Sequence, residues 1–140
     1  FIDQTGYSLQ RLYNALGKLP AKEVVVALDS CFSGAGGRSV LAQGARPLVM
    51  DLKSAALPRR NMTIISATSG SQISSTYREK GHGLFTYFML KGIKNEEVVR
   101  DDGSLAMTDL FGYLKPQVER IARKQYNNEQ LPQFIESKKN

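Results

Sequence analysis

Residues 23–34 read EVVVALDSCFSG, and this stretch decides the fold. Its run from Val24 to Leu28 is rich in β-branched residues and lacks polar alternation, which predicts a central strand covered on both faces. The strand leads into Cys31, the only cysteine of the chain, and then into small residues. Because the crevices of open α/β sheets lie beyond the carboxyl ends of their strands, the pattern predicts a functional site around Cys31.

The amino-terminal half contains signals for one helix and a second strand. Ser8 is followed by apolar residues at helical spacing, so we expect a helix over residues 8–16 with Gly17 just past its end. Residues 62–67 read MTIISA and predict a short buried strand, followed by a loop of small polar residues over 68–76. We expect the carboxyl ends of the two strands to lie close together.

The carboxyl-terminal half predicts two helices and an edge strand. An apolar helix is expected from Leu84 to near Gly92, and a second one, capped by Thr108, through Ile121. Residues 131–136 are expected to add a short edge strand. Strands that alternate with helices indicate an α/β fold, with a mostly parallel sheet flanked by helices on both faces.

Size and composition favour one domain with an ordinary charged surface. The chain has 140 residues, enough for a single core. Nineteen basic and thirteen acidic side chains give a net charge of +6, but they are scattered, so we expect no nucleic-acid partner. No apolar run is long enough to span a bilayer, and no membrane partner is expected. The single cysteine excludes an internal disulfide, which fits either a reducing compartment such as the cytoplasm or a thiol kept free for chemistry.

No cofactor or metal motif is evident. The Gly-rich residues 34–37 are not followed by Lys and Ser or Thr, so they do not form a phosphate-binding P-loop. Residues 100–104, RDDGS, lack the alternating oxygen ligands and the closing Glu of an EF-hand, and we interpret them as a turn. The sequence from Ser33 to Arg60 has no sustained period and predicts a long loop, which in compact domains is usually a functional segment.

Cys31 is a candidate nucleophile or an inert buried residue. A free thiol has a pKa near 8.5 and needs a base or positive potential to become a thiolate at neutral pH. The small residues around it would let a substrate backbone approach and would leave the Cys31 N–H free to stabilise an oxyanion. The alternative is that Cys31 is a small hydrophobic residue of the core.

Residues 28–34, LDSCFSG, resemble the nucleophile segment of the caspase and metacaspase family of cysteine peptidases, and are closer to metacaspases and their bacterial relatives than to animal caspases. Residues 66–74, SATSGSQIS, are similar to the family's loop after the next strand. Residues 81–88, GHGLFTYF, are similar to the start of its following helix, and residues 131–133 to a late Thr-Pro-Gln-type segment. The resemblance covers nearly the whole chain.

This resemblance implies a caspase-like three-layer fold in which residues 1–140 are the carboxyl-terminal portion of a single peptidase domain. The nucleophile is then Cys31, and the family's base is a histidine about 50 residues earlier. That histidine and the first strands of the sheet are expected in an upstream segment or chain, before Phe1. His82, the only histidine here, is a less favoured base and matches a structural position in the family.

The resemblance also implies how a peptide or protein substrate is chosen. Asp29 matches the acidic residue of the pocket for the residue before the cut, which predicts cleavage after Arg or Lys. Ser66 and Gln72 are weaker candidates for lining that pocket. A capping role for Asp29 at the next turn is an alternative that is compatible with the first.

Two further hypotheses remain open. The long loop carries arginines at which such an enzyme could process itself: Arg38, Arg46, Arg59 and Arg60. In the competing functional interpretation, the chain is a catalytically inactive caspase-like module that acts as a scaffold or regulatory partner.

Overall fold

The chain forms a mixed α/β structure. The computed structural model describes residues 7–30, 61–69 and 72–137. Its elements, in chain order, are α2 (Leu9–Leu16), β1 (Val24–Leu28), β2 (Met62–Ser66), β3 (Thr76–Tyr77), the 3-10 helix η1 (Arg78–Lys80), β4 (His82–Gly83), α3 (Leu84–Ile93), α4 (Met107–Tyr126) and β5 (Gln133–Glu136). Cys31, the long loop and its four arginines lie outside the described residues.

The main sheet has the strand order β1-β2-β5 among the described residues. β1 runs parallel to β2, in a register that pairs Val24 with Met62 and Leu28 with Ser66. β5 runs antiparallel to β2 and pairs Gln133 with Ser66. The described sheet is therefore mixed, with one parallel and one antiparallel pairing, and the edge strand expected near the carboxyl terminus is present.

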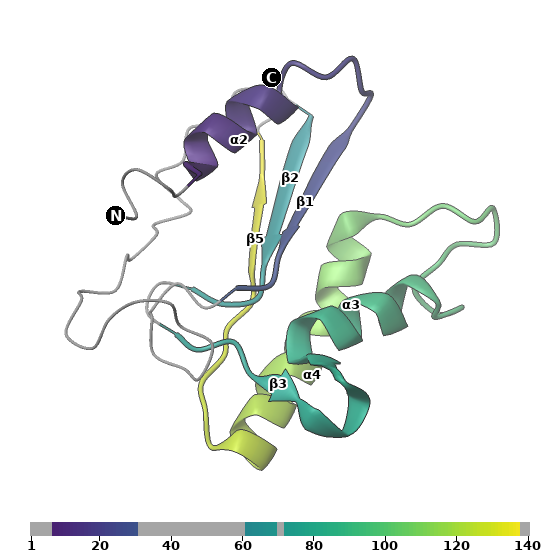
Figure 1. Ribbon diagram of the computed structural model, residues 1–140. Helices are drawn as coiled ribbons and strands as arrows, with labels where there is room; N and C mark the ends of the chain where they lie inside the picture. The colour runs from purple at the N-terminus through teal and green to yellow at the C-terminus, as the bar shows by residue number, and fades with distance from the viewer. Residues whose placement is uncertain (1–6, 31–60, 70–71, 138–140) are drawn as a thin grey trace.

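Helices cover both faces of this sheet, as the sequence predicted. On one face, the fully buried Tyr13 of α2 packs with Val24 and Val26 of β1 and with Met62 and Ile64 of β2. On the other face, Ile65 joins a larger apolar cluster that is built mainly from α3 and α4. Figure 1 shows the resulting three layers, with α2 on one side of the strands and α3 and α4 on the other.

The prediction that β1 is a central strand covered on both faces is wrong for the described part of the structure. β1 lies at the edge of the sheet, and only Val24 and Val26 on its α2 side are buried. Val25 is 46% exposed and Ala27 is also exposed, because the large cluster around α3 and α4 packs under β2 and β5. β2 is the strand that is buried along its whole length.

Helix ends follow the sequence signals except at α4. Ser8 caps α2, since its Oγ accepts a hydrogen bond from the Arg11 N–H at 3.5 Å. Thr108 was expected to be the N-cap of α4. The N-cap is instead Ala106, two residues earlier, and Thr108 lies inside the first turn. Ala106 has an extended backbone, and its carbonyl accepts from the Leu110 N–H at 3.0 Å, so the helical ladder starts there.

Two shorter features complete the description. The turn predicted over residues 100–104 is confirmed: Gly103 has a φ of 78°, and Asp102 Oδ1 accepts from the Ser104 N–H at 2.9 Å. The small antiparallel pair of β3 and β4, which precedes α3, was not predicted. Within the described residues, no helix has both the length and the apolar character needed to cross a membrane.

Candidate active site

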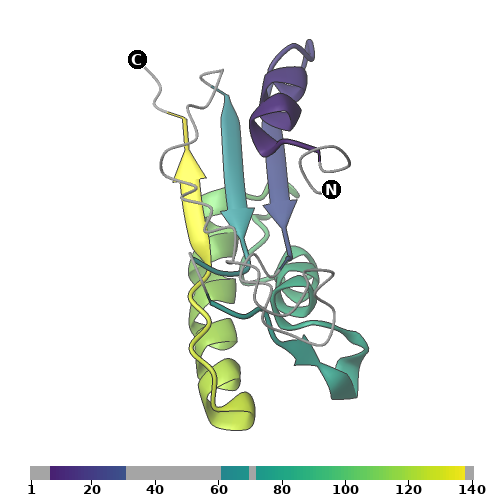
Figure 2. The same ribbon diagram turned by 60° about the vertical axis from the view of Figure 1, so that its left-hand side comes forward.

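The candidate site lies at the carboxyl end of the parallel strands. Asp29 follows β1 directly, and Ala67 and Thr68 follow β2 at the same end of the sheet. The start of α3 and the β3–β4 hairpin lie beyond this end, as Figure 2 shows below the tip of the β1 arrow. Cys31 comes two residues after Asp29 in the sequence, outside the described residues.

The Asp29 carboxylate is the centre of a hydrogen-bond cluster that joins distant parts of the chain. Its Oδ1 accepts from the Ser74 hydroxyl at 2.7 Å, across 45 residues of sequence. Its Oδ2 accepts from the Thr86 hydroxyl at 2.5 Å and from the Thr86 backbone N–H at 3.3 Å, across 57 residues. These contacts hold the end of β1, the loop after β2 and the first turn of α3 in one place.

The contact with Thr86 makes Asp29 a cap for α3. The first N–H groups of a helix have no partner inside the helix, and a negative charge at that end is favoured by the helix dipole. Gly83, the N-cap residue of α3, has no side chain to supply, and Asp29 accepts the N–H of Thr86 in its place. Asp29 therefore caps a helix that is distant in sequence, whereas the next turn, for which the sequence predicted a cap, lies outside the described residues.

Gly83 is required by the close approach of Asp29. A Cβ at position 83 would lie 2.1 Å from Asp29 Oδ2 and 3.0 Å from its Cγ, well inside van der Waals contact. The backbone of Gly83 has φ −60° and ψ 145°, which any residue can adopt. The glycine is thus explained by the room that the carboxylate needs and not by an unusual backbone conformation.

The two weaker pocket candidates make contacts that organise backbone. Ser66 is fully buried, and its hydroxyl donates to the Thr68 carbonyl at 3.0 Å. Gln72 Oε1 accepts from the Ser69 hydroxyl at 3.2 Å and from the Leu131 N–H at 2.9 Å. The structure brings Asp29 together with Ser74 and Thr86, neither of which was singled out from the sequence.

Two amide side chains from the segment between α4 and β5 fix the loop that carries Ser74. Gln130 is 1% exposed; its Oε1 accepts from the Ser75 N–H at 2.8 Å and its Nε2 donates to the Ala67 carbonyl at 3.1 Å. Asn128 Nδ2 donates to the Ile73 carbonyl at 2.9 Å. Because Ser74 lies between these anchor points, its hydroxyl is held against Asp29. In the sequence, the only indication of this anchoring role is that Asn128 and Gln130 lie in a polar stretch, residues 127–130.

His82 lies next to this cluster in the chain. It is exposed and pairs with Tyr77 in the β3–β4 hairpin. Its neighbour Gly83 touches Asp29, so the hairpin stands at the carboxyl end of β1. His82 lies two residues before the start of α3.

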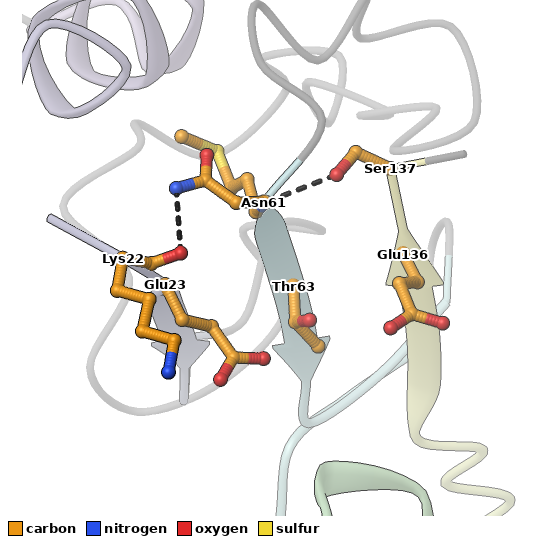
Figure 3. Close-up of a pocket in the computed structure, with 7 residues that line it drawn as sticks. Lys22, Glu23, Asn61, Thr63, Glu136 and Ser137 are labelled. Atoms are coloured by element: carbon orange, nitrogen blue, oxygen red, sulfur yellow. Dashed lines mark hydrogen bonds between the residues drawn. The ribbon is translucent and has the colours of Figure 1, made fainter. Parts of the chain in front are cut away.

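A cavity lies at the opposite end of the sheet. It has a volume of about 160 Å³, and Figure 3 shows its lining. The lining residues, at the amino ends of β1 and β2 and beside β5, are Lys22, Glu23, Asn61, Met62, Thr63, Glu136 and Ser137. Its polar groups serve the backbone: Asn61 Nδ2 donates to the Lys22 carbonyl at 3.0 Å, and Ser137 Oγ accepts from the Met62 N–H at 2.9 Å. Of the predicted site residues that the structure describes, Asp29, Ser66 and Gln72, none lines it.

The described ranges contain no group of three or more His, Cys, Asp or Glu side chains arranged to hold a metal ion. Comparison of the chain with protein-family models, with curated proteins and with solved structures finds no match in any of the three.

Proposed function

We propose that the chain is the carboxyl-terminal portion of a caspase-like catalytic domain of the metacaspase type, a cysteine endopeptidase that cleaves after Arg or Lys. The observation that supports this function is the convergence at Asp29. The three stretches that resemble the family's nucleophile segment, second-strand loop and helix start each supply one part of the cluster: Asp29, Ser74, and Gly83 with Thr86. Contributions to one functional site would explain why these distant stretches meet at Asp29.

The reaction starts at Cys31, which comes two residues after Asp29 in the sequence. Its thiolate attacks the scissile carbonyl carbon, and an S–C bond forms while the carbonyl electron pair moves to oxygen. The backbone N–H of Cys31 donates to this oxyanion. The C–N bond then breaks, the leaving amine takes up a proton, and water hydrolyses the thioester to restore the thiol.

A histidine takes the thiol proton and passes it to the leaving amine. Since His82 is the only histidine of these 140 residues and fits a structural role, the proposed base comes from elsewhere, in an upstream segment or a second chain. The His82→Ala variant is expected to keep its turnover. Loss of all turnover in a folded His82→Ala variant would instead assign the base to His82.

The charge of Asp29 supplies the preference for basic residues. A carboxylate forms charge-assisted hydrogen bonds with guanidinium and ammonium groups, and it repels the carboxylate of a substrate Asp. Asp29 remains exposed although it caps α3, so one carboxylate can serve both roles.

The test is a set of peptides that differ only at the residue before the scissile bond, with Arg, Lys, Ala or Asp at that position. The complete protein in which these residues occur is compared with its Cys31→Ala variant, and thermal unfolding shows that both are folded. We expect cleavage after Arg and Lys and none by the variant. Efficient cleavage after Asp with none after Arg would refute the pocket assignment. Equal, background-level turnover by both proteins would favour the inactive module that acts as a scaffold or regulatory partner.

Self-processing is a second part of this proposal. The arginines at 38, 46, 59 and 60 follow the nucleophile in sequence and have the residue type that the enzyme is proposed to cut after. Intact-mass measurement of the active protein against the Cys31→Ala variant should show cleavage only in the former. Identical intact chains would exclude processing at these arginines.

A further inference from the structure

We propose that Thr86 restricts Asp29 to a single free acceptor position, so that the substrate's basic side chain is held by one hydrogen bond and Arg is accepted little better than Lys. This inference rests on the proposed function, and it names the residue that sets the specificity of that site.

The restriction follows from the acceptor positions of the carboxylate. A carboxylate has about four lone-pair positions, two on each oxygen. On Oδ2, both are used by Thr86, one by its hydroxyl and one by its backbone N–H. On Oδ1, Ser74 uses one. Among the described residues, the position that remains is therefore on Oδ1.

Gly83 crowds Oδ2 as well, apart from the position that the Thr86 hydroxyl occupies. The backbone of Gly83 lies so close to this oxygen that even a methyl group at position 83 would sit 2.1 Å away. The Thr86 N–H belongs to the first turn of α3 and cannot move without unwinding that turn. A basic side chain of the substrate is therefore expected to donate to Oδ1, the oxygen with the free acceptor position.

This arrangement removes the usual advantage of arginine. The guanidinium group recognises carboxylates best in a bidentate manner, with one N–H on each oxygen, whereas the lysine ammonium binds as a point charge. With Oδ2 filled, the guanidinium can donate to Oδ1 alone. We expect kcat/KM for Arg and Lys peptides to lie within about tenfold of each other, since one extra hydrogen bond of this kind is worth about that factor.

Four forms of the complete protein test the role of Thr86. Thr86→Ala removes the hydroxyl and its methyl group, which opens one position on Oδ2, and should raise the Arg-to-Lys ratio of kcat/KM by about tenfold. Thr86→Ser keeps the hydroxyl and should keep the wild-type ratio. Ser74→Ala frees a position on Oδ1 only and should change both substrates alike. A purely structural role of Thr86 in capping α3 would lower both activities together and leave the ratio unmoved.

A substrate-side measurement on the unmodified protein does not depend on any variant being folded. Replacing the substrate arginine with ω-N-monomethylarginine keeps the charge but interferes with bidentate contact. With a single hydrogen bond to Oδ1, kcat/KM should fall by no more than a few-fold. A fall of a hundredfold, or an Arg-to-Lys ratio that Thr86→Ala leaves unchanged, would overturn the inference while cleavage after basic residues continued. Absence of any cleavage after Arg or Lys would instead overturn the proposed function and this inference with it.

Discussion

The Gly83→Ala substitution is the sharpest test of the Asp29 cluster. Its new methyl group would lie 2.1 Å from Asp29 Oδ2, so the carboxylate must move by about 1 Å or more to reach ordinary contact. That movement breaks the two hydrogen bonds to Thr86. Because the carboxylate is exposed and water can replace its partners, each bond is worth about 1 kcal/mol and the pair about 2 kcal/mol.

An opposing contribution comes from the unfolded chain. Alanine loses less conformational freedom on folding than glycine, which stabilises the protein by about 0.4–1 kcal/mol where the backbone is unstrained, as it is at Gly83. The net loss in the free energy of unfolding should then be about 1–1.5 kcal/mol. In an Asp29→Ala background the three atoms nearest to the methyl group are gone and any other described atom lies 3.3 Å away or more, so Gly83→Ala should stabilise the protein by about 0.4–1 kcal/mol.

Urea unfolding of the four proteins in this double-mutant cycle measures the coupling between the two positions, which we expect to be about 2 kcal/mol. Gly112 offers a matched control, because it lies inside α4 and, apart from the adjoining backbone of that helix, no described atom lies within 4 Å of an added Cβ. Gly112→Ala should stabilise the protein by about 1 kcal/mol. An equal cost of Gly83→Ala in both backgrounds would refute the argument from close approach.

Three further predictions concern stability. The hydroxyl of the fully buried Tyr13 has no hydrogen-bond partner among the described residues, and burial raises its pKa. Tyr13→Phe should therefore increase the free energy of unfolding, measured in urea, by about 1 kcal/mol. A decrease in that free energy would show that the hydroxyl has a partner. Gln130→Ala leaves two buried backbone groups unpaired and should cost about 3 kcal/mol in the same assay; a loss below about 1 kcal/mol would contradict the anchoring role. Hydrogen bonds from the Ser104 hydroxyl and N–H hold the pKa of Asp102 in the folded protein below its ordinary value. The stability that these bonds contribute is therefore fully present at a pH above the ordinary pKa of Asp. It is lost as the pH falls through the lowered pKa of the folded state. An NMR titration of the Asp102 carboxyl should show the lowered pKa, and Ser104→Ala should return it toward the ordinary value.

Local patterns in the sequence determined most of the secondary structure. The apolar run from Val24 to Leu28 is a strand with the expected bounds, and the capping signal of Ser8 starts α2. These features depend on neighbours within a few residues, which the sequence displays directly. The expected cap at Thr108 failed because Ala106, with no side-chain cap, already adopts the extended conformation from which the ladder of α4 starts.

Only the tertiary structure decided what surrounds each strand and which groups meet Asp29. That β1 is the exposed edge of the described sheet depends on where α3 and α4 pack, and no pattern within residues 24–28 carries that information. Ser74 and Thr86 reach Asp29 across 45 and 57 residues. The sequence could identify Asp29 as an acidic residue at a strand end, but a hydrogen bond is a matter of a few ångströms between atoms that only the packed sheet and helix bring together.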